Sequence, residues 1–219
     1  MDVEILGLVG FAGAGKDSVA NSLVDNYGYA RDSFAAPLKD ATSAIFGWPR
    51  ELLEGDTSES RAFRETTDIF WSNKLGIQDL TPRKALQLLG TDVIRDNFSE
   101  NIWLSSIEYR IRTQHMNSGK KIVITDARFP NELKLIHNLG GKIARVSRGS
   151  NPSWFNIAEL ANSGDEAALE TMSKDYEGIH ISEWSWVGSN IDYHIENAGT
   201  LDDLEGHVAF MMAKQAELI

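Results

Sequence analysis

The stretch VEILGLVGFAGAGKDSVANSLVDNYG, residues 3–28, decides the fold of this 219-residue chain. Its first part, Val3 to Phe11, is a continuous apolar run, which is typical of a strand buried on both faces of a parallel sheet. Its last part carries apolar residues at helical spacing and stops at Gly28, a residue type that commonly ends helices. The order strand, glycine loop, helix predicts the first unit of an α/β fold.

The glycine loop itself, Gly10 to Lys16, reads GFAGAGK and matches the pattern G-x-x-x-x-G-K. Glycines at these places let backbone N–H groups converge on phosphate oxygens, and the following helix offers its positive N-terminus to the same anion. Lys16 adds a mobile positive charge. Because a buried strand precedes the loop and an amphipathic helix follows it, we expect a phosphate-binding P-loop and not a simple turn.

Asp17 stands where most P-loops place a hydroxyl that binds Mg²⁺. A carboxylate is a charged oxygen ligand, and it can either bind the metal directly or anchor the waters of the metal. Ser18, one position later, keeps a hydroxyl within reach of a phosphate oxygen. The sequence therefore predicts an intact phosphate cradle with Asp17 as its candidate metal ligand.

The rest of the chain alternates between strand and helix patterns, which favours an α/β fold with a mainly parallel sheet. Gly90 and Thr91 are expected to break or bend one of the helices, and residues 49–81 are expected to form a charged surface region with one short helix. The expected strands are 120–129, 142–148 and 192–197, and the expected helices are 33–47, 61–70, 81–98, 99–119, 131–141 and 200–218.

Residues 149–190 interrupt this alternation with Gly, Asn, Pro, Ser and acidic residues around one expected helix at 164–175. Such an excursion is either a lid-like or substrate-side segment or a surface insertion. Trp184 and Trp186 lie in it, where they either stack on a base or pin the loop, and we favour pinning. We expect one domain over 1–219.

The composition excludes several classes of protein. Hydrophobic residues make up 42% of the chain, enough for one sizeable core, and the absence of cysteine excludes disulfide scaffolds and thiolate chemistry. No apolar run approaches the roughly 20 residues that span a bilayer. A net charge of -11 disfavours a nucleic-acid polymer as partner. We expect a cytoplasmic protein that holds a small phosphate ligand through a local cluster of cations.

Asp126 and Arg128 follow the buried run IVIT, at the end of a strand where open α/β sheets bind ligands. The carboxylate is placed to orient a substrate or metal, and the arginine to stabilise charge on a phosphoryl group. The alternative is a surface ion pair. Glu132 is equally compatible with a solvated helix position, and taken singly Lys39, Arg64 and Arg83 read as surface charges.

In their order along the chain, the pieces GKDS, APLKDA, RET, RKALQLLGTDVIRDNFSENIW, TDARFPNE, HISE and IENAGTLDDL resemble the deoxynucleoside monophosphate kinases of tailed bacteriophages. These enzymes belong to the P-loop nucleoside monophosphate kinase superfamily, and an Asp after the P-loop lysine is usual among them. The resemblance covers most of the chain, although residues 149–179 have no placed counterpart. It implies a P-loop kinase fold with about five strands in a mainly parallel sheet.

The resemblance also implies the activity, the transfer of the γ-phosphoryl group of ATP to a deoxynucleoside 5'-monophosphate with Mg²⁺, in the host cytoplasm. Small-molecule nucleotides would be the partners, with no membrane partner, and a homodimer is left open. Arg64 and Arg128 would lie closest to the transferring group, with Lys16 and Asp126 beside them in the catalytic set. The donor phosphates would be held by Gly13, Ala14, Gly15, Lys16, Asp17 and Ser18, and the acceptor by Lys39, Arg64, Arg83, Gly90, Thr91, Trp103, Asp126, Arg128 and Glu132.

Two other functions remain compatible with the residues. A dephospho-coenzyme A kinase, or another small-molecule P-loop kinase, would share the loop, the sheet and the clustered arginines. A nucleotide-binding switch is a different class, and the sequence disfavours it because no guanine-reading N-K-x-D pattern and no strand ending in paired acids is found.

Overall fold

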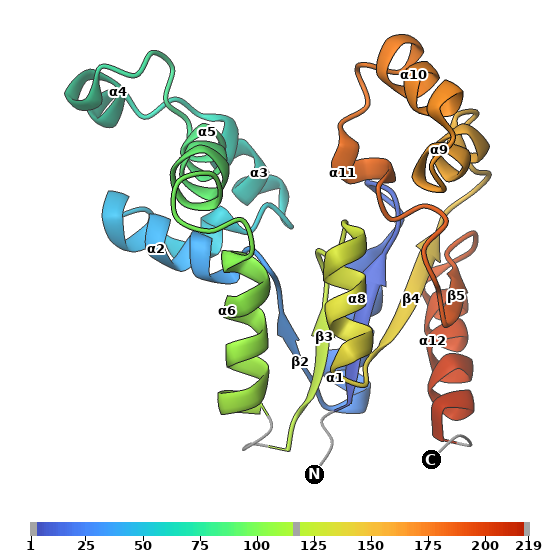
Figure 1. Cartoon of the computed structure of the whole chain (residues 1–219). Coiled ribbons are helices and arrows are strands. Elements are labelled where there is room, and N and C mark those ends of the chain that lie inside the picture. Colours follow the sequence, from blue (N-terminus) through green and yellow to red (C-terminus); the bar gives the residue numbers. More distant parts are fainter. Residues whose placement is uncertain (1–3, 116–118, 217–219) are drawn as a thin grey trace. The chain divides into compact units, whose positions relative to one another are not determined.

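The computed structural model describes residues 4–115 and 119–216, and its chain divides into two compact units (Figure 1). Unit 1 comprises Met1–Ser33 and Ile111–Ile219, and unit 2 comprises Phe34–Arg110. The expectation of one domain over 1–219 stays a prediction. Among the described residues, no helix is both long enough and apolar enough to cross a bilayer.

Unit 1 is built on a five-stranded sheet in the order β2-β3-β1-β4-β5, and every neighbouring pair is parallel. The register pairs Leu6 of β1 with Val123 of β3 and Leu8 of β1 with Ala144 of β4. The strands are β1 (Ile5–Val9), β2 (Tyr29–Asp32), β3 (Lys121–Ile124), β4 (Lys142–Ser147) and β5 (Tyr193–Glu196). The expected parallel α/β sheet is confirmed, and the start of the first expected strand, Val3, lies outside the described residues.

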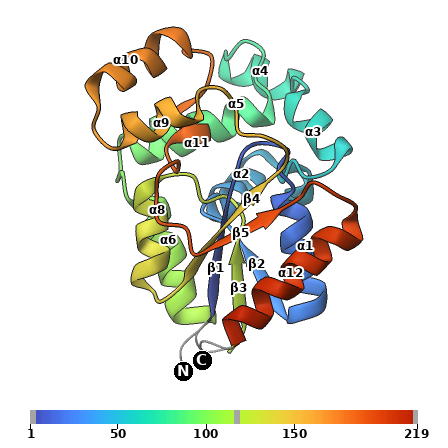
Figure 2. The ribbon, with the colours of Figure 1, turned by 90° about the vertical axis from the view of Figure 1, so that its right-hand side faces the viewer.

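Helices cover both faces of this sheet (Figure 2). The helices α1 (Lys16–Tyr27) and α12 (Leu201–Ala216) lie on one face, and α8 (Pro130–Asn138) lies on the other. All five residues of β1 are buried, as its continuous apolar run predicts. Each fully buried Leu or Ile side chain contributes about 1.5–3 kcal/mol to folding. The central strand that carries the P-loop is therefore the most firmly held part of the unit.

The segment between β4 and β5 is more regular than its composition suggests. It holds three helices: α9 (Phe155–Asn162), α10 (Glu166–Asp175) and α11 (Ile181–Trp184). The expectation of an irregular excursion with one helix is wrong for α9 and α11, whereas the expected helix at 164–175 is confirmed in α10. Gly164, with a φ of 99°, separates α9 from α10. Gly164 and its neighbours thus form a tight turn between two helices and not an irregular loop.

Unit 2 is helical. Its elements are α2 (Ala36–Phe46), η1 (Arg50–Leu53), α3 (Ser58–Glu65), α4 (Ile69–Leu75), α5 (Pro82–Gln87), η2 (Leu88–Arg95) and α6 (Ile102–Arg110). Trp48 stacks on Phe46 at a ring distance of 4.3 Å, and its indole Nε1 donates to Asp68 at 2.8 Å. Together with Leu53 and Leu80, the Trp48 ring forms the core of this unit.

Three expectations for unit 2 are corrected. The single short helix at 61–70 is two helices, because Asp68 caps the start of α4 by accepting from the backbone N–H of Trp71. Gly90 does not break its helix but lies in η2, a π-helical continuation of α5. On α2, the spacing of Leu38, Ala41 and Ile45 predicts one apolar face, but Ile45 is 58% exposed.

The expected helix over 99–119 begins three residues late, at Ile102, and Ser99 contributes a backbone carbonyl, not a side-chain cap. Its last described turn is π-helical, η3 (Ile111–His115), and belongs to unit 1. Residues 116–118 lie outside the described part of the chain. As residues that commonly cap helices, Thr81 and Thr200 are predicted to cap α5 and α12, and both caps are confirmed, because each hydroxyl accepts a backbone N–H three residues on.

Candidate functional site

The P-loop connects β1 to α1 at the carboxyl edge of the sheet. Gly10, Gly13 and Gly15 all have positive φ angles, which other residues rarely adopt. A Cβ atom on Gly10 would collide with the carbonyl of Val146, and one on Gly15 would collide with the side chain of Asn197. At Gly13 a Cβ would meet no atom within 4 Å, so the loop is open there. The loop is therefore tight at its two ends and open in its middle, as an anion cradle requires.

Lys16 begins α1, and its ammonium group folds back onto the loop. The Nζ atom donates to the carbonyl of Gly10 at 2.7 Å and to that of Phe11 at 3.1 Å. Burial lowers the pKa of Lys16 and so does the charge of Arg128, while Glu183 and Asp17 oppose that shift. These effects place Arg128 and Glu183 in the electrostatic surroundings of the P-loop lysine.

Asn197 holds the last turn of the loop and was not identified from the sequence. Its Nδ2 atom donates to the carbonyl of Ala14 at 2.9 Å. Asn197 directly follows β5, and its own backbone N–H donates to Ser147 at the end of β4 at 2.7 Å. The piece IENAG contained this residue, but 183 positions separate Asn197 from Ala14, and no local pattern links them.

Asp17 lies in the first turn of α1 and forms an ion pair with Arg31 of β2. Its side chain is 60% exposed, and as an anion it also complements the positive N-terminus of the helix. Ser18 follows it in the same turn and is half-buried. The carboxylate is accessible to a metal ion, and Arg31 is the group that such an ion would compete with.

Asp126 and Arg128 follow the end of β3, next to the P-loop strand β1. Glu132 on α8 is 5% exposed, and its Oε2 atom accepts the backbone N–H groups of Arg128 at 2.7 Å and of Phe129 at 3.0 Å. Glu132 is thus not a solvated helix carboxylate. It fixes the turn that presents Arg128.

Glu183 of α11 joins Arg128 to the P-loop. Its Oε1 atom accepts from Nη1 of Arg128 at 2.7 Å, and its Oε2 atom accepts the backbone N–H of Ala12 at 3.3 Å. Nη1 of Arg128 also donates to the Ser182 hydroxyl at 3.4 Å. One carboxylate therefore bridges the strand-end guanidinium of Arg128 and a backbone N–H of the glycine loop, so both donors reach the same anionic group.

Aromatic side chains hold α11 and the P-loop together. The ring of Phe11 lies 5.1 Å from that of Trp186 and 5.2 Å from that of Trp154. Trp184 and Trp186 are both buried, and Trp186 donates to the Glu183 carbonyl at 2.9 Å. Their burial favours the interpretation that these tryptophans pin the excursion, which stays a prediction.

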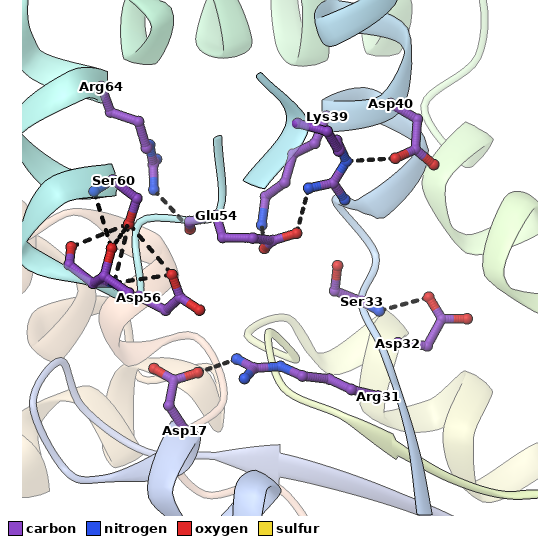
Figure 3. A network of polar contacts seen from close by, with 12 residues as sticks. Asp17, Arg31, Asp32, Ser33, Lys39, Asp40, Glu54, Asp56, Ser60 and Arg64 are labelled. Atoms are coloured by element: carbon purple, nitrogen blue, oxygen red, sulfur yellow. Dashed lines mark hydrogen bonds and ion pairs between the residues drawn. The ribbon is translucent and has the colours of Figure 1, made fainter. Parts of the chain in front are cut away.

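In unit 2, Lys39 and Arg64 converge on Glu54 (Figure 3). Lys39 and Arg50 pair with the two carboxylate oxygens of Glu54, and Arg64 donates to its backbone carbonyl at 3.1 Å. Burial raises the pKa of Glu54, but the hydrogen bonds and charges of Lys39 and Arg50 outweigh burial and lower it. Lys39 and Arg64 are therefore not isolated surface charges, and Arg50 is a third cation that sequence reasoning missed.

The other expected acceptor residues of unit 2 lie on three helices. Arg83 of α5 forms an ion pair with Glu65, the neighbour of Arg64 on α3. The Trp103 indole is buried and donates to the carbonyl of Gly90 at 3.0 Å. Thr91 is exposed in η2 beside Gly90. Trp103 thus holds the π-helical turn in place, and such turns often occur at functional sites.

The structure therefore gathers the expected residues into one group in each unit. Unit 1 holds Gly13 to Ser18, Asp126, Arg128 and Glu132 at the carboxyl edge of its sheet, and unit 2 holds Lys39, Arg64, Arg83, Gly90, Thr91 and Trp103. Within residues 4–115 and 119–216, no group of three or more His, Asp or Glu side chains is arranged to hold a metal.

A family profile and two relatives match this chain. The profile of the family "Deoxynucleotide monophosphate kinase" matches residues 50–159. A protein of Acanthamoeba polyphaga mimivirus, provisionally named deoxynucleotide monophosphate kinase, is 34% identical over 154 residues, which cover 66% of this chain and 74% of that protein. The deoxynucleoside-5'-monophosphate kinase of Escherichia phage T5 is 31% identical over 180 residues, which cover 60% of this chain and 71% of that protein.

Among solved structures, TT1252 from Thermus thermophilus aligns over 98% of both chains with a TM-score of 0.49 and 18% identity. The family profile matches half of the chain, and the matches to the two relatives extend beyond residues 50–159. This chain belongs to the deoxynucleotide monophosphate kinase family.

Proposed function

We propose that this chain transfers the γ-phosphoryl group of ATP to a deoxynucleoside 5'-monophosphate. Family membership supports the reaction and the acceptor class, and the P-loop with its cationic neighbours supports a nucleoside triphosphate as donor. The observation that carries the proposal is the bridge from Arg128 through Glu183 to the backbone N–H of Ala12. It means that a strand-end guanidinium and the phosphate cradle lie close enough to share one anion.

In this proposal the P-loop binds the donor. Backbone N–H groups around Gly13, the N-terminus of α1 and the Lys16 ammonium hold the β and γ phosphates. Lys16 exchanges its hydrogen bonds with the carbonyls of Gly10 and Phe11 for phosphate oxygens. Mg²⁺, when bound, neutralises charge between the donor phosphates, and Asp17 is the carboxylate we propose for its shell.

The acceptor needs little help from a side-chain base, because its phosphate is already an anion. The barrier lies in bringing two anions together in line, and cations lower it. We propose that Lys39, Arg64 and Arg83 bind the acceptor phosphate, and that Arg128 stabilises charge on the transferring group.

The experiment that tests this function is a phosphorylation assay with ATP and Mg²⁺ against the common dNMPs, the corresponding NMPs and dephospho-coenzyme A. The expected result is phosphorylation of one or more dNMPs. Phosphorylation of dephospho-coenzyme A alone would instead assign the chain to that activity. Hydrolysis of ATP with no acceptor phosphorylated would favour a nucleotide-driven switch.

Asp17→Asn tests the metal role of this residue. If Asp17 belongs to the shell of Mg²⁺, the Mg²⁺ concentration for half-maximal activity should rise several-fold, because a charged ligand is replaced by a neutral amide. Activity measured against Mg²⁺ at saturating nucleotide gives the answer. The Ser18→Ala variant should weaken nucleotide binding at every Mg²⁺ concentration.

Arg31→Gln is the matched control, because it breaks the same ion pair and leaves the Asp17 carboxylate in place. It should not raise the Mg²⁺ requirement. An unchanged Mg²⁺ profile in Asp17→Asn would mean that the carboxylate does not bind the metal. Its role would then be to pair with Arg31, in an exposed ion pair worth about 0–1 kcal/mol, and to complement the N-terminus of α1.

Arg83→Ala tests the acceptor site. A charge-assisted contact to phosphate is worth about 1.5–3 kcal/mol, so the KM for the acceptor should rise by at least about tenfold and the KM for ATP much less. Steady-state kinetics with each substrate varied in turn measures both constants. The exposed Arg61 of α3 provides the control Arg61→Ala, which removes the same charge from unit 2. Equal effects on both KM values would contradict a role in acceptor binding, and Arg83 would then be only the partner of Glu65 in a surface ion pair.

A further inference from the structure

The carboxylate of Glu183 lies where the proposed function expects a phosphate. Its two oxygens accept from two different donors, the backbone N–H of Ala12 in the glycine loop and the guanidinium of Arg128. Both donors are of the kinds that bind phosphate oxygens in P-loop enzymes. A carboxylate and a terminal phosphoryl group share a negative charge and a pair of oxygens that match such donors.

The position of this carboxylate depends on tertiary structure. Glu183 and Ala12 are 171 residues apart, and α11 is held against the loop by Trp186, whose ring contacts Phe11. The hydrogen bond from the Trp186 indole to the carbonyl of Glu183, at 2.9 Å, fixes the backbone next to the carboxylate. Glu183 is thus presented to the loop by a packed element and is only 28% exposed.

A donor phosphate and the Glu183 carboxylate cannot occupy the same position at the P-loop at the same time. Two anions cannot accept from the same N–H and the same guanidinium N–H, and their charges repel at that distance. Binding of a triphosphate therefore requires the Glu183 side chain to leave Ala12 and Arg128. The apparent dissociation constant of the donor then equals the intrinsic one divided by the fraction of molecules in which the carboxylate has left the loop.

We propose that the Glu183 carboxylate is a built-in competitor of the donor phosphate, which occupies the P-loop and holds Arg128 until a nucleoside triphosphate displaces it. The proposal rests on the proposed function, because it takes the P-loop as the donor site. It assigns Glu183 a role in setting donor affinity. It also means that Arg128 becomes available to the transferring group only once the donor has replaced the carboxylate.

The test is equilibrium binding to the Glu183→Gln variant, with ATP and with inorganic tripolyphosphate, each measured with Mg²⁺ and with EDTA. The amide keeps the shape of the side chain but removes its charge, so the dissociation constant of both ligands should fall by about tenfold. Tripolyphosphate has no base or sugar, and it isolates the competition for the phosphate site. Thermal unfolding of the variant establishes that it is folded.

The matched control is Glu177→Gln, which removes one negative charge from an exposed position on the same segment. It should change both dissociation constants less than twofold. An equal gain in Glu177→Gln would overturn the proposal, because the effect would then be one of net charge. Unchanged or weaker binding to folded Glu183→Gln would also overturn it, and weakening only with Mg²⁺ would make Glu183 part of the metal shell.

Binding to the wild-type protein distinguishes failure of the proposed donor site from failure of the proposed competition. Failure of the wild type to bind both ATP and tripolyphosphate would overturn the proposed donor site, and this inference with it. Binding by the wild type with no gain in Glu183→Gln would overturn the competition alone and leave the proposed function intact.

Discussion

Lys16→Ala is expected to lower kcat/KM by on the order of 10³-fold, as loss of a positioned electrostatic group does in other enzymes. The ammonium is the charge that follows the donor phosphates, and a methyl group cannot replace it. Lys16 is half-buried and contacts the loop carbonyls of Gly10 and Phe11, but it is not a member of the hydrophobic core. The variant should therefore stay folded while it loses catalysis.

Two measurements on the same preparation check this expectation. Initial rates give kcat/KM, and thermal unfolding gives the stability of the variant. The control is Lys134→Ala, which removes the same charge from an exposed position on α8. Turnover near that of the wild type in folded Lys16→Ala protein would refute the assignment of Gly10 to Lys16 as a P-loop.

Those parts of unit 1 that local patterns specify were predictable from the sequence. The P-loop is marked by its glycine motif, and the strands β1 and β3 are marked by continuous apolar runs, which are typical of a sheet covered on both faces. β2 was missed because its four residues, YARD, include the charged Arg31 and Asp32 and form no apolar run, and the strand lies at the edge of the sheet. Only the resemblance implied about five strands.

Contacts between distant residues were not predictable. Glu183 lies within HISE and Asn197 within IENAG, but no local pattern assigns either a role, because each contacts a P-loop residue more than 170 positions away. Arg50 and Glu54 looked like ordinary charges of a surface region, and only folding brings them to Lys39. Local sequence specifies which residues can bind an anion, and tertiary structure specifies which of them share one.

The glycine at position 90 illustrates the same limit on a smaller scale. Glycine within a helical pattern favours a break, but Gly90 is buried where a Cβ would press on the side chain of Leu38. The helix continues through it in π-helical form, with its freed carbonyl accepting from the Trp103 indole. Close packing against α2, and not chain reversal, is the physical reason for a glycine here.

Arg128 is the residue whose geometry bears most directly on catalysis. Its backbone is fixed by the buried Glu132, while its guanidinium donates to Glu183 and Ser182 and its side chain is 44% exposed. A fixed backbone with a displaceable side-chain partner suits a group that must meet charge appearing during the reaction. A planar guanidinium reaches two phosphoryl oxygens at once, which an ammonium group does not.

Arg128→Lys is therefore expected to lower kcat by on the order of 10² or more, with only a small change in the KM for ATP. That combination is typical of an interaction that is stronger in the transition state than in the ground state, because an interaction of equal strength in both states changes KM and leaves kcat unchanged. Steady-state kinetics with both substrates varied gives kcat and both KM values. Arg61→Lys makes the same chemical change at an exposed position of unit 2 and should leave all three constants near those of the wild type.

The opposite pattern would identify a different role for Arg128. If kcat stays within a few-fold of the wild type and only the KM for the acceptor rises, the guanidinium binds the acceptor phosphate equally in the ground state and the transition state. Stabilisation of the transferring group would then need another cation. Arg64 would be the leading candidate, because a guanidinium there offers the same two-oxygen geometry.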